Sequence, residues 1–177
     1  MDISQIFFTQ IAVNTFIFAL AALWYLVPRL SSAPLAVALV PLLFLNTIRT
    51  VGLVFLVQGV VGSSLPDALA APAAYGDSVA AVLALLALLA LRARWRLALA
   101  FVWLFNLEGT VDLLYAFGQV VRVNLAANYA LGSAWFIPTF LAPAMLLSHI
   151  LIFWLLLRPR PAAQVTAPAQ PEMRATL

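Results

Sequence analysis

The sequence predicts an all-α polytopic membrane protein: a bundle of five transmembrane helices with the N-terminus outside and the C-terminus in the cytoplasm. Of its 177 residues, 66% are hydrophobic and only 8% are charged, whereas soluble domains carry about 25% charged residues. Five stretches approach the roughly 20 apolar residues that cross a hydrocarbon core of about 30 Å. The arginines gather on one side of these stretches. This composition excludes soluble enzymes, disordered linkers and nucleic-acid-binding proteins.

The five predicted spans lie within a transmembrane domain of residues 1–158. They cover residues 6–27, 35–61, 72–91, 97–119 and 133–157. Pro28 is expected to end the first span, and the Gly-Ser-Ser sequence at 62–64 the second. The third is expected to start at Pro72, a favourable first-turn residue, which places Asp77 inside the span. The segment 120–131 between the last two spans predicts a short interfacial helix.

The distribution of arginine predicts the orientation. One side of the bundle carries Arg29, Arg92, Arg94, Arg96, Arg158, Arg160 and Arg174. The other carries only Arg122, beside Asp2 and Asp67. Because arginine-rich segments stay in the cytoplasm, the C-terminus is expected there, on a disordered Pro/Ala-rich tail of residues 159–177. The residues before the first span include an acid and no base, unlike a signal peptide, so this helix is expected to be retained.

Other features of the composition bear on location and cofactors. All nine basic residues are arginine and none is lysine, which is typical of GC-rich bacterial genes and predicts the bacterial inner membrane. The chain has no cysteine, which excludes disulfides, thiolate metal sites and cysteine nucleophiles. One histidine excludes bis-histidine haem ligation within the chain. Since phosphate-loop, serine-hydrolase and paired-histidine motifs are also missing, no cofactor and no metal site is expected.

Each predicted span carries a polar residue near the same depth. The predicted ligand- or ion-binding residues are Asn14, Asn46, Arg49, Asp77, Glu108, Asp112, Tyr115 and His149. Counted from the cytoplasmic ends at 1.5 Å per residue, all except Tyr115 lie roughly 12–22 Å deep. Glu108, Asp112 and Tyr115 are spaced by four and three residues and therefore share one helix face. We expect these side chains to surround one pocket, with Gly52, Gly59 and Gly109 allowing close helix contact.

The charges in this group are unbalanced. A charge at the bilayer centre costs at least about 2.5–3.5 kcal/mol, so Arg49 and the acids are expected to face the interior. One interpretation is an ion pair between Arg49 and Glu108 that holds the bundle together. However, Asp77, Glu108 and Asp112 would leave two surplus negative charges if all three ionise. Burial then favours the neutral form of at least one carboxyl, or a cation shares the site.

His149 and the prolines have both structural and functional interpretations. His149 is either a hydrogen-bonded packing residue or part of a proton relay. A metal site formed by His149, Glu108 and Asp112 lacks any recognised ligand spacing. Prolines within the second and fifth spans each free the carbonyl four residues earlier. Pro143 thereby frees the carbonyl of Thr139, which we expect either to be part of a simple bend or to face the pocket.

Three functions follow from this pattern. The first is binding of a small amphipathic or cationic ligand, or conduction of a proton or cation, in the pocket. The second is an intramembrane enzyme, such as an isomerase of a lipid-like substrate, with Glu108, Asp112 and His149 as candidate catalytic residues. The third is a structural or assembly subunit of a larger membrane complex. The expected partners are the lipid bilayer and the ligand or proton, with a homo-oligomer or larger complex left open and no nucleic acid.

Overall fold

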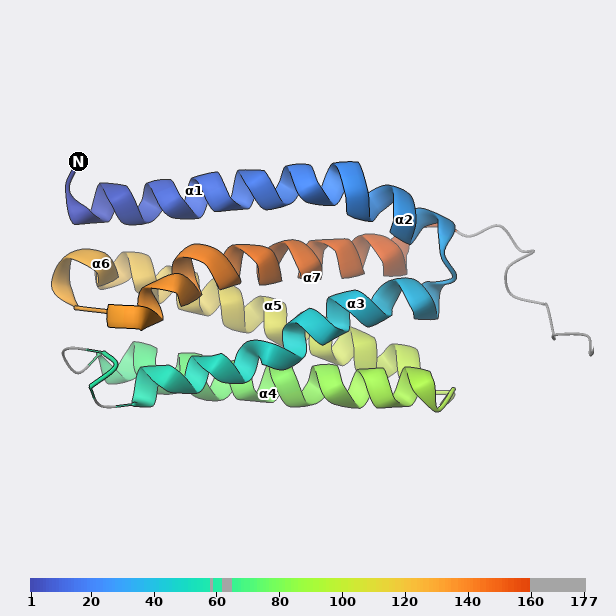
Figure 1. Cartoon of the computed structure of the whole chain (residues 1–177). Helices are drawn as coiled ribbons and strands as arrows, with labels where there is room; N and C mark the ends of the chain where they lie inside the picture. Colours follow the sequence, from blue (N-terminus) through green and yellow to red (C-terminus); the bar gives the residue numbers. More distant parts are fainter. Residues whose placement is uncertain (58, 62–64, 160–177) are drawn as a thin grey trace, which may run out of the picture.

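A computed structural model describes residues 1–57, 59–61 and 65–159, and its elements are helical throughout this part of the chain. Figure 1 shows long helices lying side by side along one common direction. Five of them are long and apolar enough to cross a membrane. They cover Ile3–Ser32, Leu35–Leu56, Ala68–Arg92, Ala98–Arg122 and Gly132–Leu157. The prediction of an all-helical chain with five helices that can cross a membrane is confirmed by length and composition. The predicted tail lies outside the described residues from position 160 onward.

The first long helix combines α1 (Ile3–Ala21), a π-helical turn (Ala22–Leu26) and α2 (Val27–Ser32). It begins with a capping box, in which the Asp2 carboxylate accepts from the Gln5 backbone N–H at 2.8 Å and the Gln5 side chain accepts from Asp2 N–H at 3.0 Å. The predicted end at Pro28 is wrong. Pro28 lies inside the continuous helix, directly after the π-helical turn and Val27, so the helix continues past it.

The second long helix changes its geometry halfway. α3 (Leu35–Thr47) passes into a 3-10 helix (Ile48–Leu56). Runs of 3-10 helix longer than three or four residues are uncommon, and a mid-helix run often marks a functional or strained segment. The predicted end at residue 61 is wrong, because the 3-10 rise of about 2.0 Å per residue covers the same length with fewer residues than the α-helical 1.5 Å.

The remaining helices complete the bundle. α4 (Asp67–Arg92) starts before Pro72 and α5 (Ala98–Arg122) extends three residues past the predicted end. The short α6 (Leu125–Asn128) lies in the segment where a short helix was predicted. The last long helix begins with a 3-10 turn (Gly132–Trp135) and a π-helical turn (Ile137–Leu141) before α7 (Ala142–Leu157).

Two carbonyls freed by prolines are satisfied by side chains of neighbouring helices. Pro72 removes the donor for the Ala68 carbonyl, and the Tyr115 hydroxyl of α5 donates to that oxygen at 3.0 Å. This compensation explains why α4 tolerates Pro72 in its interior. Pro143 does the same to the Thr139 carbonyl, which accepts from Nδ2 of Asn14 at 2.7 Å. The Thr139 carbonyl therefore anchors α1 to the last helix, and the prediction that it faces a pocket is wrong.

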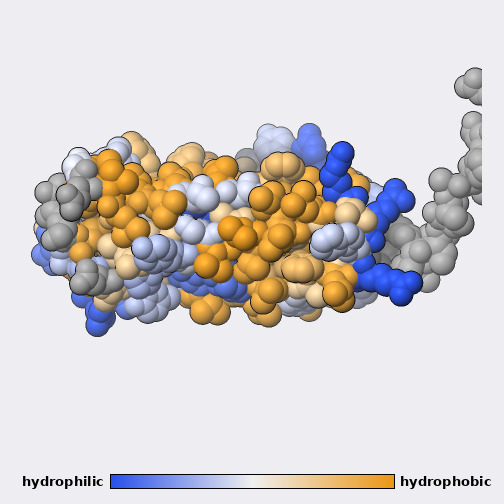
Figure 2. All heavy atoms as spheres, turned by 90° about the horizontal axis from the view of Figure 1, so that it is seen from below, coloured by the Kyte–Doolittle hydropathy of each residue, from blue (hydrophilic) through white to orange (hydrophobic). Residues whose placement is uncertain are grey.

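The apolar core is divided into two parts. One cluster, including Leu39, Leu43, Phe105 and Ile152, lies toward the end where α7 stops. The other, including Phe7 and Leu125, lies toward the N-terminus and α6. Between them lie buried polar side chains of the second, third, fourth and last long helices. Figure 2 shows apolar side chains covering much of one face, with strongly hydrophilic residues concentrated at the end where α7 stops.

The Asn14–Thr139 hydrogen bond gives a test of this proline compensation. Replacing Asn14 with alanine should lower the free energy of unfolding by about 1–3 kcal/mol, because the Thr139 carbonyl loses its donor. Adding Pro143→Ala supplies a backbone N–H four residues along and should restore part of that loss. Unfolding of wild type, both single variants and the double variant in detergent would measure this coupling. Strictly additive effects would contradict the assignment.

Candidate functional site

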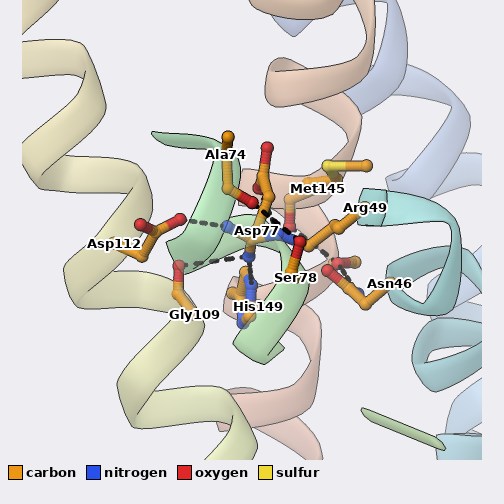
Figure 3. A network of polar contacts seen from close by, with 10 residues as sticks. Asn46, Arg49, Ala74, Asp77, Ser78, Gly109, Asp112, Met145 and His149 are labelled. Atoms are coloured by element: carbon orange, nitrogen blue, oxygen red, sulfur yellow. Dashed lines mark hydrogen bonds and ion pairs between the residues drawn. The ribbon is translucent and has the colours of Figure 1, made fainter. Parts of the chain in front are cut away.

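The buried guanidinium of Arg49 is the centre of the polar region. Arg49 lies in the first turn of the 3-10 segment and its side chain is fully buried. Figure 3 shows it approached by α4, α5 and α7, with Asp77, Asp112, Gly109 and His149 around it. Four of the five long helices therefore meet at one side chain.

Arg49 makes four polar contacts. Its Nε donates to Asp77 Oδ1 at 2.7 Å and its Nη2 donates to Asp112 Oδ2 at 2.5 Å, so both contacts are ion pairs. Its Nη1 donates to the Gly109 carbonyl at 3.3 Å and lies 3.2 Å from Nε2 of His149. Charge-assisted hydrogen bonds of this kind are roughly twice as strong as neutral ones. They offset the desolvation of a guanidinium that has no exposure.

His149 acts as a hydrogen-bond acceptor toward Arg49. A guanidinium can only donate, so Nε2 of His149 must be unprotonated and the ring proton lies on Nδ1. That nitrogen lies 2.8 Å from Oδ1 of Asn106, whose Nδ2 donates to the His149 carbonyl at 3.3 Å. The ring also stacks against Phe105, with centroids 5.1 Å apart. These contacts favour the hydrogen-bonded packing role over the proton relay.

Glycines make room for the charged groups. A Cβ at Gly52 would overlap the carboxylate of Asp77, and one at Gly76 would overlap that of Asp112. A Cβ at Gly109 would lie 2.7 Å from the His149 ring and 2.9 Å from Nη1 of Arg49. The predicted close contact is thus present at Gly52 and Gly109. It is wrong for Gly59, which has open space around it and instead adopts a φ of +89°.

The other predicted site residues lie outside this contact group. Glu108 does not bond to Arg49; it is half-buried, and its Oε2 is buried without a partner among the described residues. The predicted Arg49–Glu108 pair is therefore wrong, since Asp77 and Asp112 take its place. Tyr115 caps the Ala68 carbonyl and Asn14 caps that of Thr139.

Asn46 links the 3-10 junction to α7 rather than to the charges. Its Nδ2 donates to the Leu42 carbonyl and to the Ser148 hydroxyl, each at 2.8 Å, and its Oδ1 is buried with no partner in the described part of the chain. Ser148 donates in turn to the Met145 carbonyl at 2.7 Å.

Asn106, Gly76 and Ser148 were not predicted as site residues. Asn106 could have been found from the sequence, because it is an amide side chain in an apolar span, three residues before Gly109. Amide side chains in membrane helices often form hydrogen bonds between helices.

A small cavity borders the two carboxylates that pair with Arg49. Its volume is about 50 Å³, and Asp77 and Asp112 are its only charged lining residues. The rest of the wall is apolar and includes Phe55, Phe117 and Ile137. The two carboxyl side chains are 13% and 11% exposed, whereas Arg49 is not exposed. Whatever enters the cavity therefore meets negative charge and no positive charge.

The described residues contain no group of three or more histidine, cysteine or acidic side chains that could hold a metal ion. Two of the three candidate catalytic residues, Asp112 and His149, are engaged by Arg49. Three carboxyls near one guanidinium can accept a proton or a cation.

A family model described as a domain of unknown function, DUF8737, matches residues 6–157. The chain belongs to this family. The matched region contains Arg49 and all of its contacts, so the buried cluster lies within the domain that defines the family. The comparisons found no match among curated proteins or solved structures.

Removal of the central charge should destabilise the bundle. Arg49→Met leaves two buried carboxylates without their counter-ion, and we expect a loss of about 3–5 kcal/mol in unfolding free energy. Because a neutral site needs no counter-ion, Arg49→Met combined with Asp77→Asn and Asp112→Asn should recover most of that loss. Denaturant titration in detergent measures both. A triple variant that is less stable than Arg49→Met would contradict the ion-pair account.

The glycine contacts predict a position-dependent effect of one added methyl group. Gly76→Ala should cost about 1–3 kcal/mol, because the new Cβ displaces the Asp112 carboxylate from Arg49. Gly118→Ala in α5 is the matched control, since a Cβ there meets nothing within 4 Å. Thermal unfolding of the two variants in the same detergent should show a decrease for the first and no decrease for the second, because alanine favours the helix more than glycine does. Equal decreases would contradict this packing.

Proposed function

We propose that this is a multi-pass protein of the bacterial inner membrane, with its N-terminus outside, whose Arg49 cluster reversibly binds a proton or a small cation. The orientation is supported by the described arginines near the end where α7 stops. These are Arg29, Arg92, Arg94, Arg96 and Arg158. Arginine-rich ends face the cytoplasm. The other end carries Asp2 and Arg122.

The excess of negative charge beside a cavity is the observation that carries the proposal. Arg49 balances one of the two carboxylates that it contacts, so the ionised group carries at least one surplus negative charge. Glu108, one turn before Asp112 on α5, adds a second when it is ionised. An uncompensated charge in this environment is costly. A proton on a carboxyl, or a cation between the carboxyls, removes that cost.

The size of the cavity selects the kind of occupant. By the measure in which one water needs about 10–15 Å³, a volume of about 50 Å³ accepts a few waters. It is about a third of a cavity that accepts benzene, roughly 150 Å³. This favours a proton carried by water, or a cation of the size of ammonium or sodium, over the larger amphipathic ligand that the sequence also suggested.

The surroundings of the cluster favour access from one side. The cavity extends from Asp77 and Asp112 toward Val120 and Leu125, which lie at the N-terminal end of the bundle. On the other side, the apolar cluster around Leu39, Phe105 and Ile152 fills the bundle. Because the cavity itself lies on the outer side of the two carboxylates, the proton or cation in the proposed orientation enters from outside the cell, past the apolar cluster that includes Val120 and Leu125.

A structural lock is the second candidate, and the full set of contacts on Arg49 favours it. A guanidinium bonded to three other helices holds the bundle together whether or not a cation binds. The two functions differ in what they require of Asp112. A lock needs only enough charge to satisfy Arg49, which Asp77 alone supplies, whereas cation binding needs the surplus carboxylate.

Asp112→Asn tests the proposal, because it leaves the Arg49–Asp77 pair intact and removes the surplus charge of that group. In infrared difference spectra of the reconstituted full-length protein, we expect the wild type to show a carboxylic-acid band that changes with pH. Added ammonium or sodium should alter that change by competing with the proton. The Asp112→Asn variant should fold and lose the part of this response that comes from the pair of carboxyls on Arg49, while Glu108 keeps its own part.

Asp2→Asn is the matched control, because it is the same substitution at an exposed helix cap where asparagine serves as well as aspartate. It should behave as wild type. A folded Asp112→Asn protein that keeps the full response, or a wild type with no response to pH or cations, would leave the structural lock as the better account.

A further inference from the structure

A larger cavity lies at the arginine-bearing end of the bundle. It has a volume of about 800 Å³, is bounded by α2, α3 and α4, and shares no lining residue with the cavity beside Asp77 and Asp112. We call it the α3–α4 groove. Figure 1 shows α3 diverging from α4 toward this end, whereas the two meet near the 3-10 segment. The volume is within the range of about 300–1,000 Å³ that is typical of ligand sites.

The walls of the groove are apolar. Every lining residue is apolar except two arginines, Arg29 of α2 and Arg92 at the end of α4. Val37 and Phe44 of α3 both line the groove and are each 60% exposed. Pro41, between them, removes the backbone donor that would pair with the Val37 carbonyl. The groove therefore presents an apolar channel with cationic groups at its rim.

The two arginines have no acidic partner among the residues that the structure describes. Arg29 donates to the Tyr25 carbonyl of its own helix at 3.0 Å and stacks on the Tyr25 ring. Arg92 is exposed and forms no hydrogen bond or ion pair within the described part of the chain. Among those residues, every acid lies midway along the bundle or toward the opposite end. The positive charge at the groove is therefore available to an external anion.

We propose that the α3–α4 groove binds one anionic phospholipid, with an acyl chain along the apolar wall and the headgroup phosphate between Arg29 and Arg92. The planar guanidinium suits two-point binding of phosphate oxygens. Basic pockets between membrane helices are a recognised form of anionic lipid site. The proposal does not depend on what the Arg49 cluster binds.

The chemistry of the groove favours a lipid over other occupants. A free phosphate ion would use the arginines but leave the long apolar wall without a partner. A second copy of this chain would have to bring acids to the arginines, and its own described surface carries none near the corresponding end. A lipid with an anionic head and an apolar chain matches both features.

The test uses the full-length protein in an uncharged detergent. Phosphatidylglycerol should raise the unfolding temperature, and phosphatidylcholine with the same chains should have a much weaker effect. Native mass spectrometry should show one tightly retained phosphatidylglycerol. At about 1 kcal/mol for each arginine near a charged lipid surface, R29Q/R92Q should weaken binding roughly 25-fold, or about fivefold per arginine.

R94Q/R96Q is the matched control, because it removes two arginines from the same end that do not line the groove. It should retain wild-type binding. A36W, which places a large side chain on the exposed groove wall, should reduce phosphatidylglycerol binding with both arginines present. It provides a second test if R29Q/R92Q does not fold.

Three results would overturn the proposal. The first is equal stabilisation by the two lipids. The second is an equal loss of binding in R94Q/R96Q and R29Q/R92Q, which would indicate general attraction to the charged end. The third is the same effect from glycerol phosphate without acyl chains, which would indicate a site for free phosphate.

Discussion

The burial of one positive charge constrains much of this structure. Arg49 has no exposed surface and lies midway along a helix that is apolar enough to cross a membrane. A buried charge without a partner costs several kcal/mol, so the neighbouring helices must bring acceptors to it. α4 and α5 each supply a carboxylate, α5 adds a carbonyl, and α7 adds an imidazole nitrogen. These contacts specify the rotation of α4, α5 and α7 about their own axes.

The backbone is adapted to the same requirement. Glycines at positions 52, 76 and 109 stand where a Cβ would collide with the cluster, so these helices approach closely enough for short side chains to reach Arg49. The 3-10 geometry begins next to Arg49, at Ile48. Irregular backbone at such a place is costly unless the surrounding packing supports it. The polar contacts of Arg49 therefore depend on the glycines that let the helices approach.

The depth of the polar residues was predictable from the sequence, but the pairing was not. Hydropathy and helical rise place Arg49, Asp77, Glu108 and Asp112 at similar depth. Which carboxylate meets Arg49 depends on helix rotation. A 3-10 helix turns by 3.0 residues and an α-helix by 3.6, so the direction of side chains after Thr47 cannot be extrapolated from α3. In the structure, Asp77 and Asp112 pair with Arg49, and Glu108 does not.

The bonding partners of the carbonyls that the prolines free were also not predictable from the sequence. Sequence identifies the carbonyls that they free, and these carbonyls are the expected weak points of a helix in an apolar environment. It does not identify the donors, because Asn14 and Tyr115 lie on other helices, 125 and 47 residues away from the carbonyls they bond. Both residues looked like members of a ligand site because polar side chains in apolar spans commonly mark function. Their contacts are instead those of interhelical packing.

The two cavities divide the bundle into regions with opposite electrostatic character. The small cavity is bounded by carboxylates and the α3–α4 groove by guanidiniums, and the apolar cluster around Leu39 and Leu43 separates them. A cation bound at Asp77 and Asp112 would have to pass through this packed cluster to reach the arginine-bearing end. Close-packed interiors open only by discrete rearrangement, so the arrangement suits a site that is loaded from one side. Transfer across the membrane would require α3, which contributes to both the groove and the apolar cluster, to change its packing against α4.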